Sequence, residues 1–125
     1  MINMQQYKPN SKLTREQLLE NNFKYIDGCY SYRFSVYKYK KETTLWCSLY
    51  VNLEESTCTI NVHDGNNNTY PAFFNRKYGG THKVVESIDR KVRSQLNMFI
   101  KNGILYKKGK KKNDLFVVIR RKNFR

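Results

Sequence analysis

The chain has 125 residues, enough for one domain with a hydrophobic core of its own. Its 24 Lys and Arg residues outnumber its 10 Asp and Glu residues, and the formal charge of +14 indicates a polyanionic partner: a nucleic acid, a nucleoprotein or an acidic protein surface. No apolar run approaches the ~18 residues of a membrane span and no secretory apolar segment follows Met1, so we expect a cytoplasmic protein without a membrane partner.

The chain begins with residues 1–12, which show no periodicity and are predicted to form a flexible tail. A short helix is predicted to follow. Thr14 and Gln17 have the spacing of a capping box, and Leu13 and Leu18 have the spacing of a hydrophobic staple. The dipeptide 27–28, Asp-Gly, then indicates a turn.

Three strands are predicted at residues 29–40, 44–54 and 57–63, because apolar and polar side chains alternate there with short connections. This pattern is typical of an antiparallel meander with one apolar face. The predicted apolar face carries Tyr30, Tyr32, Phe34, Val36, Leu45, Cys47, Leu49, Val51, Leu53, Cys58, Ile60 and Val62. The opposite face is predicted to carry Arg33, Tyr37, Tyr39, Trp46, Tyr50, Asn61 and His63.

A long helix is predicted over residues 83–101, which have the strongest periodicity in the chain. Its apolar positions are Val85, Ile88, Val92, Leu96 and Phe99, and they are expected to cover the apolar face of the sheet. Thr81 is a candidate N-cap, and Gly103 followed by Ile104 is a candidate C-terminal stop. Before the helix, residues 70–74 are apolar but contain Pro71, so they are predicted to be a covering segment or an edge.

These elements indicate an α+β domain over residues 13–106. It would contain a three- to four-stranded antiparallel sheet packed on one long C-terminal helix, with a short N-terminal helix. Residues 107–125 are predicted to be a basic segment with a possible short strand at 115–119.

Two surfaces are candidates for binding a polyanion. On the outer face of the sheet, Arg33, Tyr37, Tyr39, Trp46 and Tyr50 combine aromatic rings that stack on bases with a cation that pairs with phosphate. Such a sheet can also enter the major groove of DNA. The second surface consists of Arg90, Arg93, Lys101, Lys107, Lys108, Lys110, Lys111, Lys112, Arg120 and Arg121.

Structural explanations of both surfaces stay open. Tyr and Trp favour strands whatever their function, and the N-terminal helix or Phe73 and Phe74 could cover the outer face. A basic helix face can simply be solvated, and a lysine run does not choose between DNA, RNA and an acidic protein. The oligomeric state does not follow from the sequence.

The motifs of common enzyme and metal sites are not found, so we expect no catalysis, no metal and no cofactor. The three cysteines lack C-x-x-C spacing and are predicted to be free buried thiols. The chain has no G-x-G-x-x-G, G-x-x-x-x-G-K-[ST] or H-E-x-x-H motif. A metal-dependent nuclease that uses His63 and Asp64 is a third alternative, after the two binding hypotheses.

Two resemblances sharpen these hypotheses. The order of elements over residues 29–103 is similar to that of AP2-like and integrase arm-binding domains, which implies a sheet that reads the major groove. The segments FFNRKYG (73–79), VVESID (84–89) and KKGKKK (107–112) resemble small basic proteins of phages and mobile elements, among them some Cas9-directed anti-CRISPR proteins. That resemblance implies inhibition of a host RNA-guided nuclease, with a Cas nuclease and its guide RNA as the partner.

Overall fold

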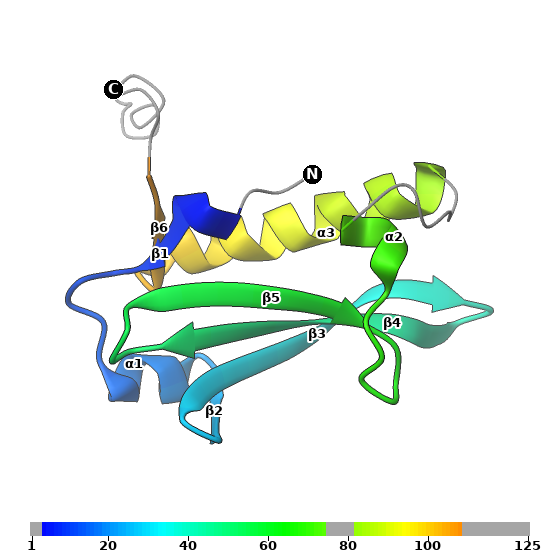
Figure 1. The fold of residues 1–125 in the computed structure, drawn as a ribbon. Coiled ribbons are helices and arrows are strands. Elements are labelled where there is room, and N and C mark those ends of the chain that lie inside the picture. The colour runs from blue at the N-terminus through cyan, green and yellow to red at the C-terminus, as the bar shows by residue number, and fades with distance from the viewer. Residues whose placement is uncertain (1–3, 75–81, 109–125) are drawn as a thin grey trace.

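The computed structural model describes residues 4–74 and 82–108, and these form an α+β fold. Strands β2 (Lys24–Ile26), β3 (Cys29–Tyr39), β4 (Glu42–Asn52) and β5 (Thr57–His63) make one antiparallel sheet in the order β2-β3-β4-β5. Figure 1 shows helix α3 (His82–Lys101) lying along one face of this sheet. The predicted fold class is therefore confirmed. The strand predicted at 115–119 and the N-cap predicted at Thr81 lie outside the described residues.

Two-residue turns join three of the strands. Asp27 and Gly28 connect β2 to β3 with φ of 51° and 87°, and Lys40 and Lys41 connect β3 to β4 with φ of 51° and 70°. A positive φ at both central residues gives a turn whose twist matches that of the flanking strands. The first turn adds β2, a short edge strand, to the predicted meander.

A bulge in β3 changes the face on which its last residues lie. Ser35 pairs with Trp46 but Tyr37, not Val36, pairs with Leu45, so Val36 is an extra residue in the strand. An extra residue reverses the side to which the following side chains point. Tyr37 therefore packs against the core, and its predicted place on the outer face was wrong, because strict alternation does not anticipate a bulge. Tyr39 follows a second irregularity in the β3–β4 pairing and is 59% exposed at the end of β3.

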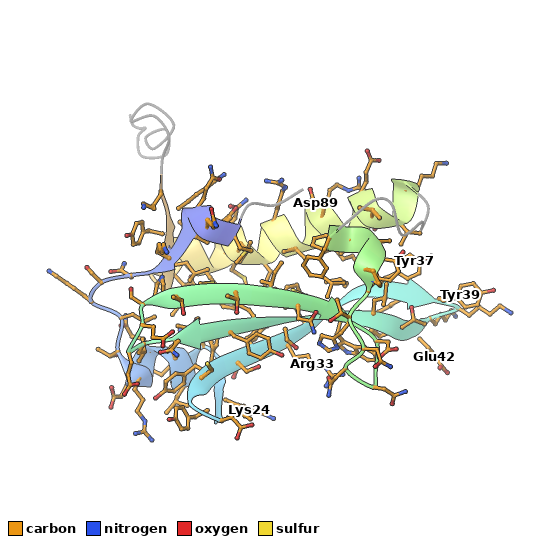
Figure 2. All side chains as sticks on the ribbon, in the orientation of Figure 1. Lys24, Arg33, Tyr37, Tyr39, Glu42 and Asp89 are labelled. Atoms are coloured by element: carbon orange, nitrogen blue, oxygen red, sulfur yellow. The ribbon has the colours of Figure 1, made fainter. Side chains whose placement is uncertain are left out.

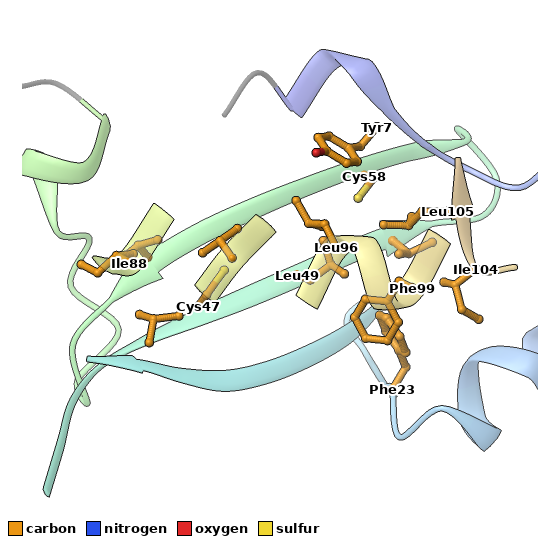
Figure 3. Close-up of a cluster of buried hydrophobic side chains, with 14 of the residues drawn as sticks. Tyr7, Phe23, Cys47, Leu49, Cys58, Ile88, Leu96, Phe99, Ile104 and Leu105 are labelled. Carbon is orange, nitrogen blue, oxygen red and sulfur yellow. The ribbon is translucent and has the colours of Figure 1, made fainter. Parts of the chain in front are cut away.

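The core lies between the sheet and α3 (Figure 3). All five predicted apolar positions of the helix are buried, and they pack with strand residues of the predicted apolar face such as Cys47, Leu49 and Val62. Phe99 is at the centre of an aromatic group, with ring centroids 5.1 Å from Phe23 and 5.1 Å from Tyr32. The hydrophobic pattern of α3 is thus explained by the burial of one face against the sheet.

Helix α3 ends as predicted, in a Schellman motif. Gly103 has φ of 80°, its N–H donates to the Ile100 carbonyl (3.1 Å), and the Ile104 N–H donates to the Phe99 carbonyl (2.9 Å). Ile104 is fully buried, which supplies the hydrophobic contact of this cap.

We expect Gly103→Ala to lower the free energy of unfolding by about 1–2 kcal/mol, because an L-residue is strained in the left-handed region. An added Cβ at Gly103 would meet no atom within 4 Å, so the loss of stability would come from backbone strain and not from a steric clash. Denaturant unfolding checks this, with Gly103→Asn as the control, since Asn adopts positive φ more readily. Equal losses in both variants would contradict the backbone explanation.

The N-terminal segment is ordered where a tail was predicted. Residues Met4–Gln6 form a 3-10 helix, η1, and Tyr7–Pro9 form strand β1, which pairs antiparallel with β6 (Leu105–Lys107). Tyr7 is buried, and that burial raises the pKa of its phenol. The prediction of a flexible tail over residues 1–12 is therefore corrected for 4–10. The reason is a pairing between the two ends of the domain, which local periodicity does not reveal.

Two short helices complete the fold. Helix α1 (Arg15–Glu20) begins with the predicted capping box between Thr14 and Gln17, and it buries Leu18 completely. Helix α2 (Pro71–Phe74) buries Ala72 and Phe73, so the segment predicted to be a cover or an edge is a cover. No helix in the described part of the chain combines the length and the apolar character needed to cross a membrane.

Candidate nucleic-acid interface

The face of the sheet turned away from α3 is the open face. Figure 1 shows that no described helix lies over its middle; α1 is at one end. The strand register puts Lys24, Ser31, Tyr50 and Thr59 in one row across this face, and Arg33, Ser48 and Asn61 in the next. Figure 2 shows Lys24 and Arg33 on the side of the sheet opposite Asp89 of α3. Three of the five predicted sheet residues, Arg33, Trp46 and Tyr50, thus share the open face.

Arg33 is held in place by Trp46. Its guanidinium carbon lies 4.8 Å from the centroid of the indole ring, which is a cation–π contact. The ring also lies close to the loop after β5, because an added Cβ at Gly65 would be 3.4 Å from it. Trp46 is therefore a support for Arg33 rather than a free platform for a base. A stacked guanidinium keeps N–H groups available at its edge for a planar or tetrahedral anion.

A hollow of about 820 Å³ lies on the open face beside Arg33. We call it the sheet hollow and define it by Lys24, Ser31, Arg33, Ser48, Tyr50 and Asn67, which all line it. Cys29 and Asp27 also contribute to its wall. The volume is in the range of small-ligand sites, and the lining combines polar and apolar groups with two cations, Lys24 and Arg33, and one acid, Asp27. The arrangement suits a polar ligand that carries negative charge.

At the floor of the sheet hollow, Ser48 is hydrogen-bonded to His63. The Ser48 Oγ and His63 Nε2 atoms are 2.7 Å apart, and the two side chains are only 5% and 1% exposed. The other ring nitrogen, Nδ1, lies 2.8 Å from the Asp64 carbonyl oxygen. A carbonyl only accepts, so Nδ1 carries a proton. In the neutral imidazole, Nε2 is then the acceptor and the Ser48 hydroxyl is the donor. Alternation in the sequence predicts that both side chains point to the outer face. The hydrogen bond between them depends in addition on the register of β4 and β5, which the sequence does not give.

The loop after β5 is organised by Asp64. Its carboxylate accepts from the backbone N–H groups of Asn66 (2.8 Å) and Asn68 (2.9 Å). The hydrogen bond from the Asn68 N–H, followed by that from Asn66, lowers the pKa of the Asp64 carboxyl. These bonds hold the loop that carries Asn67 to the sheet hollow.

The nuclease alternative finds little support in this geometry. Both nitrogens of His63 are engaged within the protein, and the Asp64 carboxylate is used by its own loop. Across residues 4–74 and 82–108, the structure brings together no group of three His, Cys, Asp or Glu side chains that could hold a metal.

The described basic residues of the second predicted surface lie on α3, on β6 and directly after β6, on the other side of the sheet from the open face. Arg90 and Lys101 are exposed, whereas the Nε atom of Arg93 lies 2.8 Å from a carboxylate oxygen of Asp89. After the helix, Lys107 belongs to β6, with its ammonium 5.6 Å from the centroid of the Tyr7 ring. Lys108 is exposed. Lys110, Lys111, Lys112, Arg120 and Arg121 lie outside the described residues.

The structure therefore places the described residues of the second predicted surface on the opposite side of the core from the open face. The described residues contain fifteen basic and nine acidic side chains, an excess of six positive charges out of the fourteen. A variant of one surface can thus be tested against a variant of the other.

The three free cysteines differ in how deeply they are buried. Desolvation raises the pKa of both Cys47 and Cys58 to about 12, whereas Cys29 is half-buried in the wall of the sheet hollow. The thiolate is the reactive form, and it is suppressed by burial in apolar surroundings.

We expect one cysteine, Cys29, to react quickly with a thiol reagent at pH 8 in the folded protein. All three should react in denaturant, because unfolding removes the desolvation that suppresses the thiolates of Cys47 and Cys58. Thiol counting with peptide mapping checks this. Rapid modification of Cys47 in the folded protein would contradict its burial.

Comparisons with known proteins support the fold. Among solved structures, the chain is similar to the crystal structure of a DUF1831 family protein from Lactobacillus plantarum, with a TM-score of 0.58 and 17% identity. The match covers 80% of this chain and 84% of that chain. At this identity the likeness establishes the fold alone. Neither the family models nor the curated proteins searched include a match to this chain.

Proposed function

We propose that this protein binds single-stranded nucleic acid on the open face of its sheet. The observation that carries the proposal is the sheet hollow, where Lys24 and Arg33 stand beside Tyr50 on a face that no described helix covers in the middle. Cations pair with phosphates and an aromatic ring stacks on a base, which is how proteins engage unpaired strands. The formal charge of +14 adds long-range attraction to any polyanion.

A single strand fits this surface better than a duplex for a geometric reason. The sheet hollow is lined by Asp27 of the turn after β2, by Asn67 of the loop after β5 and, on the sheet itself, by Ser48, which is only 5% exposed. An unpaired base can be splayed out into such a hollow, whereas a base in a duplex is held in the stack. The major-groove hypothesis needs side chains that project outward, and Trp46 instead lies against Arg33 and the loop after β5.

The proposed activity is binding rather than catalysis, and its test is an affinity measurement. Fluorescence anisotropy of a labelled 15-nucleotide strand, alone and as a duplex, should show tighter binding of the single strand. Stacking on one aromatic ring is worth about 1–3 kcal/mol, so Tyr50→Ala should weaken binding by roughly 5- to 150-fold. Tyr106→Ala is the matched control, because Tyr106 is an exposed tyrosine of β6 outside the sheet hollow.

Three results would contradict the proposal. The first is no binding of DNA or RNA at moderate salt, and the second is equal losses in the two tyrosine variants. The third is a preference for the duplex, which would favour the major-groove hypothesis. Cleavage of the strand with Mg²⁺ or Mn²⁺ that disappears in His63→Ala would instead favour the nuclease alternative.

A narrower form of the proposal is that the strand is part of a nucleoprotein, in an RNA-guided nuclease that the protein inhibits. Its support is the resemblance to Cas9-directed anti-CRISPR proteins over the segments 73–79, 84–89 and 107–112. Parts of the first and third segments lie outside the described residues. Co-purification with a guide-loaded Cas nuclease and loss of target cleavage are the expected results. Unchanged cleavage at excess protein would contradict this narrower form.

A further inference from the structure

We propose that the sheet hollow receives one unpaired base with an exocyclic amino group, which donates a hydrogen bond to Ser48 Oγ. This inference rests on the proposed binding of single strands and adds a base preference to it. Adenine, cytosine and guanine carry such an amino group, whereas thymine and uracil do not. The preference comes from the hydrogen bonds at the floor of the hollow, not from the cations around it.

A chain of two hydrogen bonds fixes the position of the Ser48 hydrogen, and its last acceptor is a backbone carbonyl. The Asp64 carbonyl accepts from His63 Nδ1–H at 2.8 Å, which leaves Nε2 of the neutral ring as an acceptor. The Ser48 hydroxyl, 2.7 Å from Nε2, therefore directs its only hydrogen at His63. Because His63 is 1% exposed, water has little access to Nε2 and does not compete with the Ser48 hydroxyl for it. Towards the sheet hollow, Ser48 Oγ then presents lone pairs and no donor.

An acceptor at that position distinguishes the bases. An amino group projects from the edge of the base and can donate to Ser48 Oγ. Thymine and uracil have a ring N3–H as their donor, but it lies between two carbonyl oxygens. Those oxygens would face the lone pairs of Ser48, and an unpaired acceptor that has lost its water weakens binding.

The remaining groups of the sheet hollow are placed for the rest of the nucleotide. Ser48 and Tyr50 are two residues apart on β4 and point to the same face, which separates their Cα atoms by about 7 Å. A base stacked on Tyr50 can thus extend its edge towards Ser48. Arg33 is directly across from Ser48 on β3, and Lys24 lies in the row of Tyr50, so a phosphate on either side of the base meets a cation.

The test compares two pyrimidines that differ at ring position 4, an amino group in cytosine and a carbonyl in thymine. Anisotropy titrations of the full chain with labelled (dC)15 and (dT)15 should give about tenfold tighter binding of (dC)15. Ser48→Ala should remove this difference by weakening the binding of (dC)15 alone, whereas Ser48→Thr, which retains the hydroxyl, should keep it. Trp46 is the chain's single tryptophan and lies beside Arg33, so its emission should change on binding.

The outcomes separate the inference from the proposal on which it rests. Equal affinities for the two strands, or a preference for (dT)15, would overturn the base preference and leave single-strand binding intact. A preference that survives in Ser48→Ala would also overturn it. Failure of both strands to bind would remove the proposed function itself. If Ser48→Ala does not fold, the affinities of the wild type and of Ser48→Thr decide.

Discussion

Phe99→Ala is expected to lower the free energy of unfolding by about 3–5 kcal/mol, the largest loss of stability that we predict for a single residue. Phe99 is 2% exposed, and its ring packs between those of Phe23 and Tyr32. Truncation would remove the buried ring and leave a cavity between α3, β3 and the segment that joins α1 to β2. A domain of this kind has about 5–15 kcal/mol of stability in all, so this loss would be a large fraction of it.

The neighbouring residue supplies the control. Met98 is 45% exposed, and Met98→Ala should change the free energy of unfolding by no more than about 1 kcal/mol. Urea unfolding followed by circular dichroism measures both. If Phe99→Ala does not fold, Phe99→Leu should still fold with a loss of about 1.5 kcal/mol or less. Similar losses at positions 98 and 99 would contradict the packing of α3 on the sheet.

The second large effect is expected in the salt dependence of binding. If Lys24 and Arg33 each neutralise one phosphate of a single strand, the double variant Lys24→Ala/Arg33→Ala should reduce the log–log slope against salt by about 1.4. Loss of each charged hydrogen bond corresponds to about 1.5–3 kcal/mol, or roughly a 10- to 150-fold weaker affinity at low salt.

The matched control removes two cations from the opposite side of the molecule. Lys83 and Lys91 are exposed on α3, and Lys83→Ala/Lys91→Ala lowers the net charge by the same amount. Titrations between 50 and 200 mM salt should show a slope close to that of the wild type for this control. If Lys83→Ala/Lys91→Ala reduces the slope more than Lys24→Ala/Arg33→Ala does, the helix face is the binding surface and the open face is not.

The sequence predicts the fold well where periodicity is strong. The five apolar positions of α3 are buried, and the inward residues of β4 and β5 are buried or partly buried against the core, because burial of one face requires a regular period. The turn at 27–28 is also found where its residues indicate. These features depend on neighbours in the chain, and a single sequence contains that information.

The features that the sequence does not predict are those that depend on contacts between segments far apart in the chain. The bulge at Val36 moves Tyr37 to the helix side, and no local signal distinguishes it from regular alternation. Strands β1 and β6 have three residues each, too few for a period, and they are defined by their pairing across the whole domain. The Ser48–His63 hydrogen bond likewise needs the register of two strands, although both residues could be assigned to one face.

The most direct test of the central claim is to map the bound strand onto the protein by NMR. Backbone amide signals of the isotope-labelled full chain would be followed during titration with (dC)15. Binding on the open face predicts that the largest shifts fall on Lys24, Ser31, Arg33, Ser48 and Tyr50, with small shifts along α3. Shifts confined to the exposed side of α3, around Arg90 and Lys101, would contradict it.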